Sequence, residues 1–164
     1  MNNTDTILQL STPYAVSAVH IIRVSGKEAH AFVKKAIGLE IIEPRKIYYR
    51  PFAVQGRTID QVISFFFTTP NSYTGEDMAE IQCHGSLIIV DAILKAGLAS
   101  GLRLAERGEF TRRAFLNGKM SLEQTEAVDT LIRSRSEFFR DNALRILENK
   151  SSLRFDTVKK DILD

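Results

Sequence analysis

The sequence predicts an α+β fold in which a mostly antiparallel sheet, packed with helices, occupies residues 1–118. The first observation is a series of short apolar runs rich in β-branched and aromatic residues, which are typical of strands. The second is that apolar residues recur with spacings of three and four between some of these runs and in residues 121–147, which indicates amphipathic helices. With 164 residues, 44% of them hydrophobic, the chain can bury one sizeable core.

The chain begins with two predicted strands, at residues 5–11 and 18–24, joined by a short turn. Ser25 and Glu28 have the S-x-x-E spacing of a capping box, so we expect a helix to begin there. The apolar positions that follow have helical spacing: Ala29, Phe32, Val33 and Ile37. Gly38 is the expected end of this helix.

A β-hairpin is predicted next, from residues 46–54 and 57–67, which are separated by Gln55 and Gly56. After a polar loop, residues 78–84 alternate between apolar and polar side chains and predict a further strand. This strand carries a glutamate in its middle, which is unusual for a strand that buries one face.

Residues 86–100 predict a helix that is apolar on most sides and therefore well buried, with Asp91 and Lys95 paired at i,i+4 on its remaining face. Residues 102–105 can form a last strand. The segment GEFTRRAFLNG, residues 108–118, predicts a helix between its two outer glycines.

The tail from residue 119 is predicted to be long amphipathic helix, beginning with a second capping box at Ser121 and Gln124. Ser136 could cap a fresh helix start and so interrupt the rod, although a continuous helix fits the pattern too. No later residues of this chain cover the apolar stripe. The stripe could fold back on the first domain, pair with another chain, or belong to a helical bundle whose remainder lies outside this sequence.

Composition and cysteine count exclude several classes of function and of covalent cross-link. The chain has 22 Lys and Arg against 20 Asp and Glu, a net charge of +2, so non-specific nucleic-acid binding is not the default expectation. The single cysteine, Cys83, excludes an internal disulfide, and its phase with Ala79 and Ile81 predicts a core residue. No apolar run approaches the roughly 18 residues of a membrane span, so we expect a cytoplasmic protein without membrane contact.

Nucleotide, metal and catalytic sites are not predicted. Gly26-Lys27 and Gly118-Lys119 resemble the end of a phosphate-binding loop, but neither has the earlier Gly or the following Ser or Thr that the motif requires. The histidines have no metal-ligand spacing with Cys83, so we interpret them as isolated residues at strand or helix surfaces: His20, His30 and His84.

Four separated blocks of the chain match a known family in order and in spacing. They are DTILQLSTP, IIRVSG, NSYTGEDMAEIQCHG and RGEFTRRAFLNGKMSLEQTEAVDTLI. Over residues 5–133 these blocks resemble the N-terminal part of the tRNA uridine-modification GTPases called MnmE or TrmE. Residues 134–164 are similar to that family only in being amphipathic helix.

The resemblance implies a division into domains. The family combines an N-terminal domain similar to the folate-binding domain of aminomethyltransferases, a helical domain, and a GTPase domain inserted in the helices. By this resemblance residues 1–118 are the folate-binding domain and residues 119–164 are the start of the helical domain, whether the sequence is a fragment or a natural short protein. The chain should not hydrolyse GTP, because GTP, Mg²⁺ and K⁺ would be bound by the GTPase domain.

The resemblance also implies partners and ligands. The full family acts with a flavin-dependent partner and uses a one-carbon unit from folate to modify the wobble uridine of certain tRNAs. Its N-terminal domain is implied to form a homodimer and to bind 5-formyltetrahydrofolate near the dimer interface. Three contacts carry over by motif: Arg23 from I-x-R-x-S-G, Glu80 from E-D-x-x-E and Lys119 from F-L-N-x-K.

The sequence departs from the family pattern at three loops, and each change bears on loop shape and so on ligand affinity. Residues 14–17 replace a glycine-rich turn, Arg107 replaces a proline, and Ser86 replaces the second glycine after His84.

The three residue types suit a folate. Period-two alternation turns Glu80 away from the side of Ala79 and Ile81, and a carboxylate can accept parallel hydrogen bonds from the adjacent N–H donors of a reduced pterin. Arg23 and Lys119 suit the carbonyl groups and the tail carboxylates of the ligand, with the assignment between them left open.

Other interpretations remain open at this stage. Glu80 could be a solvent-facing strand residue, Arg23 could pair with a nearby acid, and Lys119 could interact with the terminal carbonyl groups of the preceding helix. Two other functions are a stand-alone aminomethyltransferase-like folate enzyme, for which no catalytic group can be named, and an RNA-binding module. The RNA-binding module would use a basic cluster as a tRNA-facing patch, although a solvated face is the favoured interpretation of that cluster: Arg103, Arg107, Arg112, Arg113 and Lys119.

Overall fold

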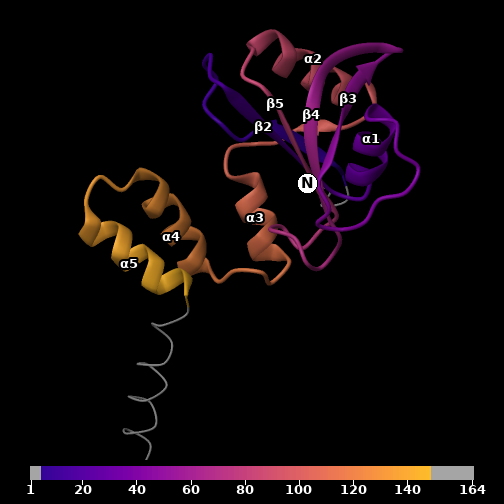
Figure 1. The fold of residues 1–164 in the computed structure, drawn as a ribbon. Coiled ribbons are helices and arrows are strands. Elements are labelled where there is room, and N and C mark those ends of the chain that lie inside the picture. The colour runs from indigo at the N-terminus through magenta and orange to yellow at the C-terminus, as the bar shows by residue number, and fades with distance from the viewer. Residues whose placement is uncertain (1–4, 149–164) are drawn as a thin grey trace, which may run out of the picture. The chain divides into compact units, whose positions relative to one another are not determined.

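The computed structural model, which describes residues 5–148, contains a six-stranded sheet with the strand order β3-β4-β5-β2-β1-β6 (Figure 1). The strands are β1 (Ile7–Leu10), β2 (Val19–Ser25), β3 (Tyr48–Val54), β4 (Arg57–Phe67), β5 (Met78–His84) and β6 (Arg103–Leu104). Only the pairing of β1 with β6 is parallel within the described part of the chain. The predicted α+β class with a mostly antiparallel sheet is confirmed.

Five helices are described: α1 (Ala29–Ala36), α2 (Leu87–Ala99), α3 (Glu109–Leu116), α4 (Leu122–Arg133) and α5 (Glu137–Leu147). The chain forms two compact units, the first ending at Arg113 and the second beginning at Ala114, and each is described by itself. The predicted domain division after residue 118 stays a prediction. The part of the predicted tail helix in residues 149–164 lies outside the described residues.

The core of the first unit lies between one face of the sheet and the two helices α1 and α2. Alternate residues of the strands supply this face, and α1 adds Phe32 and Val33 while α2 adds Val90 and Ile93. The strand residues in this cluster are Leu8, Ile22, Val24, Phe52, Val62, Phe66, Ala79, Ile81 and Cys83. Because successive strand side chains point to opposite faces, the residues between them face away from α1 and α2.

The hairpin between β3 and β4 forms where the sequence predicts it. Gln55 (φ 50°) and Gly56 (φ 78°) both have positive φ, as the common two-residue hairpin turn requires. Glycine adopts this conformation without cost, whereas glutamine does not.

The predicted capping box at the start of α1 is wrong. Ser25 is the last residue of β2, and its buried hydroxyl group bonds Thr74 Oγ1 and Glu76 Oε2, each at 2.7 Å. Glu28 is the N-cap of α1, and its backbone N–H donates to Thr6 Oγ1 at 2.9 Å. The hydroxyl group of Thr6, just before β1, therefore accepts from the backbone amide that a local cap would have satisfied.

The helix α2 is less buried than predicted. Val90, Ile93 and Gly97 are its buried residues, whereas the side chain of Ile88 is 82% exposed. The carboxylate of Asp91 accepts a hydrogen bond from the Tyr14 hydroxyl at 3.1 Å, and no ion pair with Lys95 is present among residues 5–148.

The second unit contains α4 and α5, which pack against each other. The predicted capping box is confirmed, since Gln124 N–H donates to Ser121 Oγ at 3.2 Å and Ser121 N–H donates to Gln124 Oε1 at 2.9 Å. Of the two alternatives for the tail, the interrupted helix is correct: α4 ends at Arg133 and α5 begins at Glu137. Ser136 is the N-cap of α5, but its side chain makes no capping hydrogen bond.

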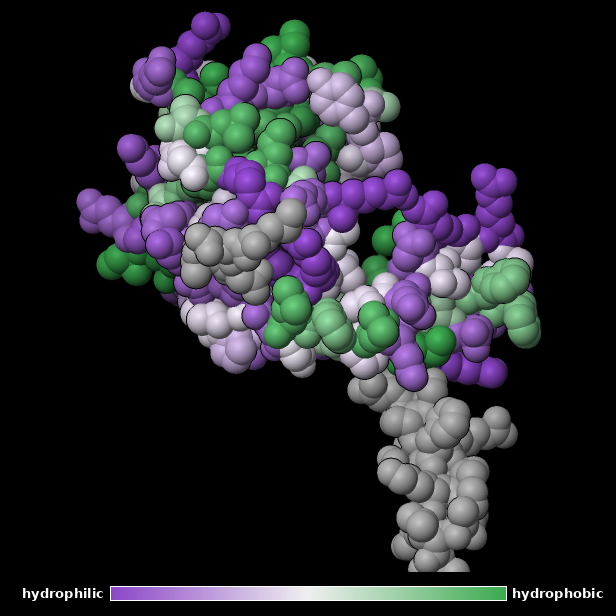
Figure 2. All heavy atoms as spheres, turned by 180° about the vertical axis from the view of Figure 1, so that it is seen from behind, coloured by the Kyte–Doolittle hydropathy of each residue, from purple (hydrophilic) through white to green (hydrophobic). Residues whose placement is uncertain are grey.

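Both units expose hydrophobic side chains. In the first unit, hydrophobic surface is gathered in the upper part of the face shown in Figure 2 and is bordered by hydrophilic side chains. In the second unit, Ile132, Phe138 and Phe139 are exposed. None of the helices within residues 5–148 has the length and hydrophobicity needed to cross a membrane.

Candidate ligand-binding site

Four side chains form a row across the sheet face that lies opposite α1 and α2. In the strand register Gln9 of β1 pairs with Arg23 of β2, Arg23 pairs with Glu80 of β5, and Glu80 pairs with Phe65 of β4. Neighbouring strands lie about 4.8 Å apart, so the row spans a strip wide enough for a bicyclic ring. The sheet thus brings two of the three predicted site residues side by side.

Arg23 and Glu80 form an ion pair. Arg23 Nε donates to Glu80 Oε1 at 2.8 Å, and Arg23 Nη2 lies 2.7 Å from the same oxygen. The side chains are half-buried, with 27% of Arg23 and 20% of Glu80 exposed. The alternative that Arg23 pairs with a nearby acid is therefore correct, and Glu80 is not a simple solvent-facing residue.

The geometry of this pair leaves hydrogen-bonding capacity on both partners. A carboxylate can accept about four hydrogen bonds, and both contacts from Arg23 reach the same oxygen, Oε1. Within residues 5–148, Glu80 Oε2 and Arg23 Nη1 have no hydrogen-bond partner. The pair can therefore accept from one group of a ligand and donate to another.

Two aromatic rings lie against the guanidinium group of Arg23. Its Cζ atom is 5.2 Å from the centroid of the Tyr73 ring and 5.7 Å from that of the Phe110 ring. The Tyr73 hydroxyl lies 2.9 Å from Thr111 Oγ1, which ties the loop before β5 to α3. Cation–π contacts of this kind restrict where Arg23 can point.

An ion network of charged side chains lies beneath this loop and α3. Arg113 is 1% exposed and contacts Asp5 Oδ1 at 2.6 Å, Glu109 Oε1 at 3.0 Å and Glu76 at 3.2 Å. Arg103 contacts Glu109 at 2.7 Å and Asp5 at 2.8 Å. The network joins the N-terminal segment, the loop that carries Tyr73, and the helix that carries Phe110.

This network corrects the interpretation of part of the basic cluster. Arg113 is buried among acids, and Arg103, which is 42% exposed, pairs with Glu109 and Asp5. The other three members, Arg107, Arg112 and Lys119, are exposed. The hydrogen bond from Arg103 is the largest cause that lowers the pKa of Glu109 to about 2. Glu109 is 2% exposed, so it stays ionised only because these guanidinium groups compensate its burial.

Lys119 lies in the second unit, directly after the turn that ends α3. Its backbone N–H donates to the carbonyl oxygen of Ala114 at 2.8 Å, and Gly118 N–H donates to that of Phe115 at 3.0 Å. These bonds confirm that Gly118 closes the helix. The membership of Lys119 in the site stays a prediction.

The loops that depart from the family pattern have an ordinary backbone. Among the described non-glycine residues only Arg45 and Gln55 have positive φ, so residues 14–17 contain no strained position. Ser17 N–H donates to the carbonyl oxygen of Gly85 at 3.1 Å, and Gly85 N–H donates to that of Ala18 at 3.1 Å. Ser86 is extended (φ −94°), a conformation that any residue adopts.

Cysteine and histidine chemistry does not add a second site. Cys83 is buried, and desolvation is the largest cause that raises its pKa to about 11, which confirms a core thiol. His20, predicted at a surface, is fully buried, with Nδ1 2.7 Å from Thr12 Oγ1. His84 Nδ1 lies 2.7 Å from Asp60 Oδ1. No group of three or more metal-ligating side chains is found in the described range.

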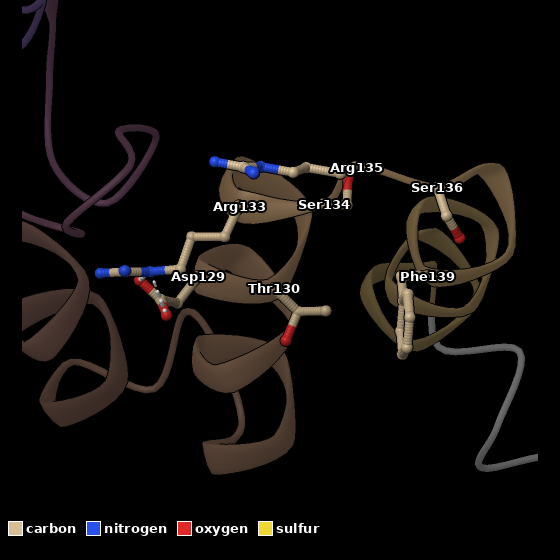
Figure 3. Close-up of a pocket in the computed structure, with 7 residues that line it drawn as sticks. All are labelled: Asp129, Thr130, Arg133, Ser134, Arg135, Ser136 and Phe139. Carbon is tan, nitrogen blue, oxygen red and sulfur yellow. Dashed lines mark hydrogen bonds and ion pairs between the residues drawn. The ribbon is translucent and has the colours of Figure 1, made fainter.

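A pocket of about 470 Å³ lies between the ends of α4 and α5, lined in part by Arg133, Arg135 and Phe139. Figure 3 shows that both arginine side chains extend away from Phe139, and Arg133 is paired with Asp129 at 2.8 Å. The charged groups do not converge on the pocket, so we assign it no ligand.

Sequence reasoning did not single out Gln9, Tyr73 or Phe110. Tyr73 and Phe110 lie inside the matched blocks, but nothing in their spacing indicates that both approach Arg23. For Gln9 a signal existed, since it is a polar residue between two leucines of a predicted strand.

The fold and the site define a class: a small α+β sheet domain with a core on one sheet face and a half-buried acid–guanidinium pair, flanked by aromatic rings, on the other. A family model described as the N-terminus of the GTP-binding protein TrmE matches residues 6–119. The chain belongs to this family.

Full-length relatives agree with this assignment. The chain is 41% identical over 160 residues to a protein of Thermosipho melanesiensis and 44% identical over 156 residues to one of Yersinia pseudotuberculosis, both named tRNA modification GTPase MnmE. A protein of the same name from Fervidobacterium nodosum is 39% identical over 168 residues. These matches cover 94–99% of the chain but only 34–37% of each relative, so the chain spans about a third of their length.

Proposed function

We propose that this chain is the tetrahydrofolate-binding and homodimerisation module of a GTPase that modifies the wobble uridine of tRNA. The observation that carries the proposal is the Arg23–Glu80 pair. In a chain of this family, the pair lies half-buried on the sheet face opposite α1 and α2. The relatives' name supports the tRNA part of the proposal.

The chemistry of the site suits a folate, and 5-formyltetrahydrofolate is the proposed ligand. Glu80 Oε2 can accept from the N–H edge of a reduced pterin, while Arg23 holds the carboxylate through its other oxygen, Oε1. Arg23 Nη1 can donate to a carbonyl group of the ligand, and Lys119 is proposed to bind a carbonyl group or a tail carboxylate. The rings of Tyr73 and Phe110 offer flat apolar surface beside a flat heterocycle.

Isothermal titration calorimetry of residues 1–164 with 5-formyltetrahydrofolate tests the ligand. We expect saturable binding by a folded sample. Heat indistinguishable from dilution at millimolar ligand would exclude a folate role for this chain.

A second copy of the chain is proposed to cover an exposed apolar surface of the first unit. Val16 and Ile88 are 84% and 82% exposed and line one open pocket of about 490 Å³. Tyr14, hydrogen-bonded to Asp91 one turn further along α2, and Val19 add 60% and 51% exposed side chains. Monomeric proteins rarely expose large clusters of apolar side chains, so such a cluster indicates an interaction surface.

The remaining partners belong to the full-length protein. The flavin-dependent partner and tRNA are proposed to meet this module only as part of that protein, in which GTP, Mg²⁺ and K⁺ bind the GTPase domain. A stand-alone aminomethyltransferase-like enzyme is not favoured, because the acid of the site, Glu80, is already paired with Arg23.

A further inference from the structure

Gln9 carries a buried polar atom that the protein does not satisfy. Its Oε1 atom is shielded from solvent and has no hydrogen-bond partner in the part of the chain that the structure describes. Leaving a buried acceptor unpaired costs free energy, so such atoms are rare and each calls for a physical reason.

The position of Gln9 supplies a reason. Gln9 is the β1 partner of Arg23, on the same sheet face, in the row that continues to Glu80 and Phe65. Of the four buried side-chain atoms without a partner among residues 5–148, only this one lies in that row. Exchanging the oxygen and nitrogen of the amide would leave a buried donor instead, so either assignment leaves one amide group unpaired.

The nearest cationic neighbour does not satisfy this atom. The Nε and Nη2 groups of Arg23 are directed to Glu80 Oε1, and its guanidinium group is held beside Tyr73 and Phe110. Among residues 5–148, Arg23 Nη1 has no partner, but it makes no hydrogen bond with Gln9 Oε1 in the structure. We therefore look for the partner of Gln9 outside the described residues.

We propose that Gln9 is a ligand-contacting, specificity-determining residue of the Arg23–Glu80 site. Its side-chain amide forms a hydrogen bond, as donor or acceptor, with a polar ring atom of the flat heterocycle bound there. This contact lies on the side of Arg23 away from Glu80. The ligand is then recognised at two points on either side of Arg23, by a carboxylate and by an amide. This inference rests on the proposed function, because the ligand is the one that Arg23 and Glu80 bind.

The variant Gln9→Met tests the inference, because methionine keeps the length of the side chain and removes its polar atoms. In the free protein the change removes a buried unsatisfied group, so we expect the melting temperature to rise by about 2–4 °C. For 5-formyltetrahydrofolate we expect the dissociation constant to increase about tenfold, equivalent to about 1.4 kcal/mol. A residue with only a structural role would not change these two quantities in opposite directions.

Gln61→Met is the matched control, since Gln61 is exposed on β4 and lies outside the row. It should change neither quantity. Unchanged folate affinity in Gln9→Met, or a lower melting temperature, overturns the role of Gln9 and leaves the proposed function standing. If the unaltered protein binds no 5-formyltetrahydrofolate, the proposed function fails and this inference fails with it.

Discussion

At the scale of single residues, the pairing of Arg23 with Glu80 explains why a strand carries a glutamate in its middle. The carboxylate is half-buried and would be costly without a partner, and the guanidinium group opposite it supplies two hydrogen bonds. The same pair presents one unused acceptor and one unused donor to a ligand.

Replacing Glu80 with glutamine should weaken folate binding without unfolding the protein. The variant Glu80→Gln keeps the shape of the side chain but replaces an anionic acceptor with an amide. Since a hydrogen bond to a charged group contributes about 1.5–3 kcal/mol, the dissociation constant should rise at least tenfold in calorimetric titration. Glu40→Gln, at an exposed loop position, is the control. Equal affinities for Glu80→Gln and the unaltered protein would remove Glu80 from the site.

Glu109 should make the stability of the protein sensitive to acid. Its pKa is lowered from 4.5 to about 2, first by the hydrogen bond from Arg103. Because the folded-state pKa lies below the unfolded value, this stabilisation is fully present above pH 4.5 and is lost as the pH falls towards 2. Urea unfolding of Glu109→Gln should show a lower free energy of unfolding at pH 7, by about 3 kcal/mol, and a smaller loss between pH 5 and pH 3. Parallel pH curves for both proteins would contradict this assignment.

At the scale of elements, local signals predicted where helices, strands and turns lie. The turn at Gln55 and Gly56 and the end of α3 shortly before Gly118 depend on a few neighbouring residues, so sequence reasoning could find them. The start of α1 could not be found in this way. Ser25 continues the ladder with Met78, and its hydroxyl group bonds Thr74, 49 residues away.

Gly85 should be essential for the junction between β5 and α2. A Cβ atom at this position would lie 1.8 Å from the backbone oxygen of Ser17, far inside van der Waals contact. Gly85→Ala must therefore displace residues 14–17 or the start of α2, and we expect a loss of about 1–3 kcal/mol in the free energy of unfolding. Chemical denaturation measures the loss.

Ser86→Ala is the neighbouring control for this experiment. The Ser86 side chain makes no capping hydrogen bond, so its removal should change stability by less than about 0.5 kcal/mol. A tolerated alanine at position 85 would show that the loop and the helix are not held as closely as the structure indicates.

At the scale of the whole molecule, the chain exposes apolar residues in both units and spans about a third of the length of its relatives. In the described part of the second unit, Ile132, Phe138 and Phe139 are exposed. The polypeptide of residues 1–164 contains no phosphate-binding loop, and we expect it not to hydrolyse GTP.

The proposed dimer should depend on Ile88. Sedimentation equilibrium of the unaltered chain should give twice the mass of 18.5 kDa, and Ile88→Glu should shift the chain to the monomer, because it buries a charge in the interface. Ile41→Glu, at a position that is 79% exposed in the loop between α1 and β3, should leave the dimer intact. A monomeric unaltered chain would exclude the dimer, and a dimeric Ile88→Glu variant would exclude this surface.

The sequence by itself determined the fold class, most element boundaries and the family, and it left the break between α4 and α5 as one of two alternatives. These properties depend on periodicity, turn residues and motif order, which are local or additive along the chain. The tertiary structure alone decided which charged and polar groups are partners. Arg23 pairs with Glu80, 57 residues away, and Arg113 pairs with Asp5, 108 residues away. The sequence contains many acids that could pair with each guanidinium group, and only the folded chain, for Arg23 through strand pairing, brings particular ones into contact.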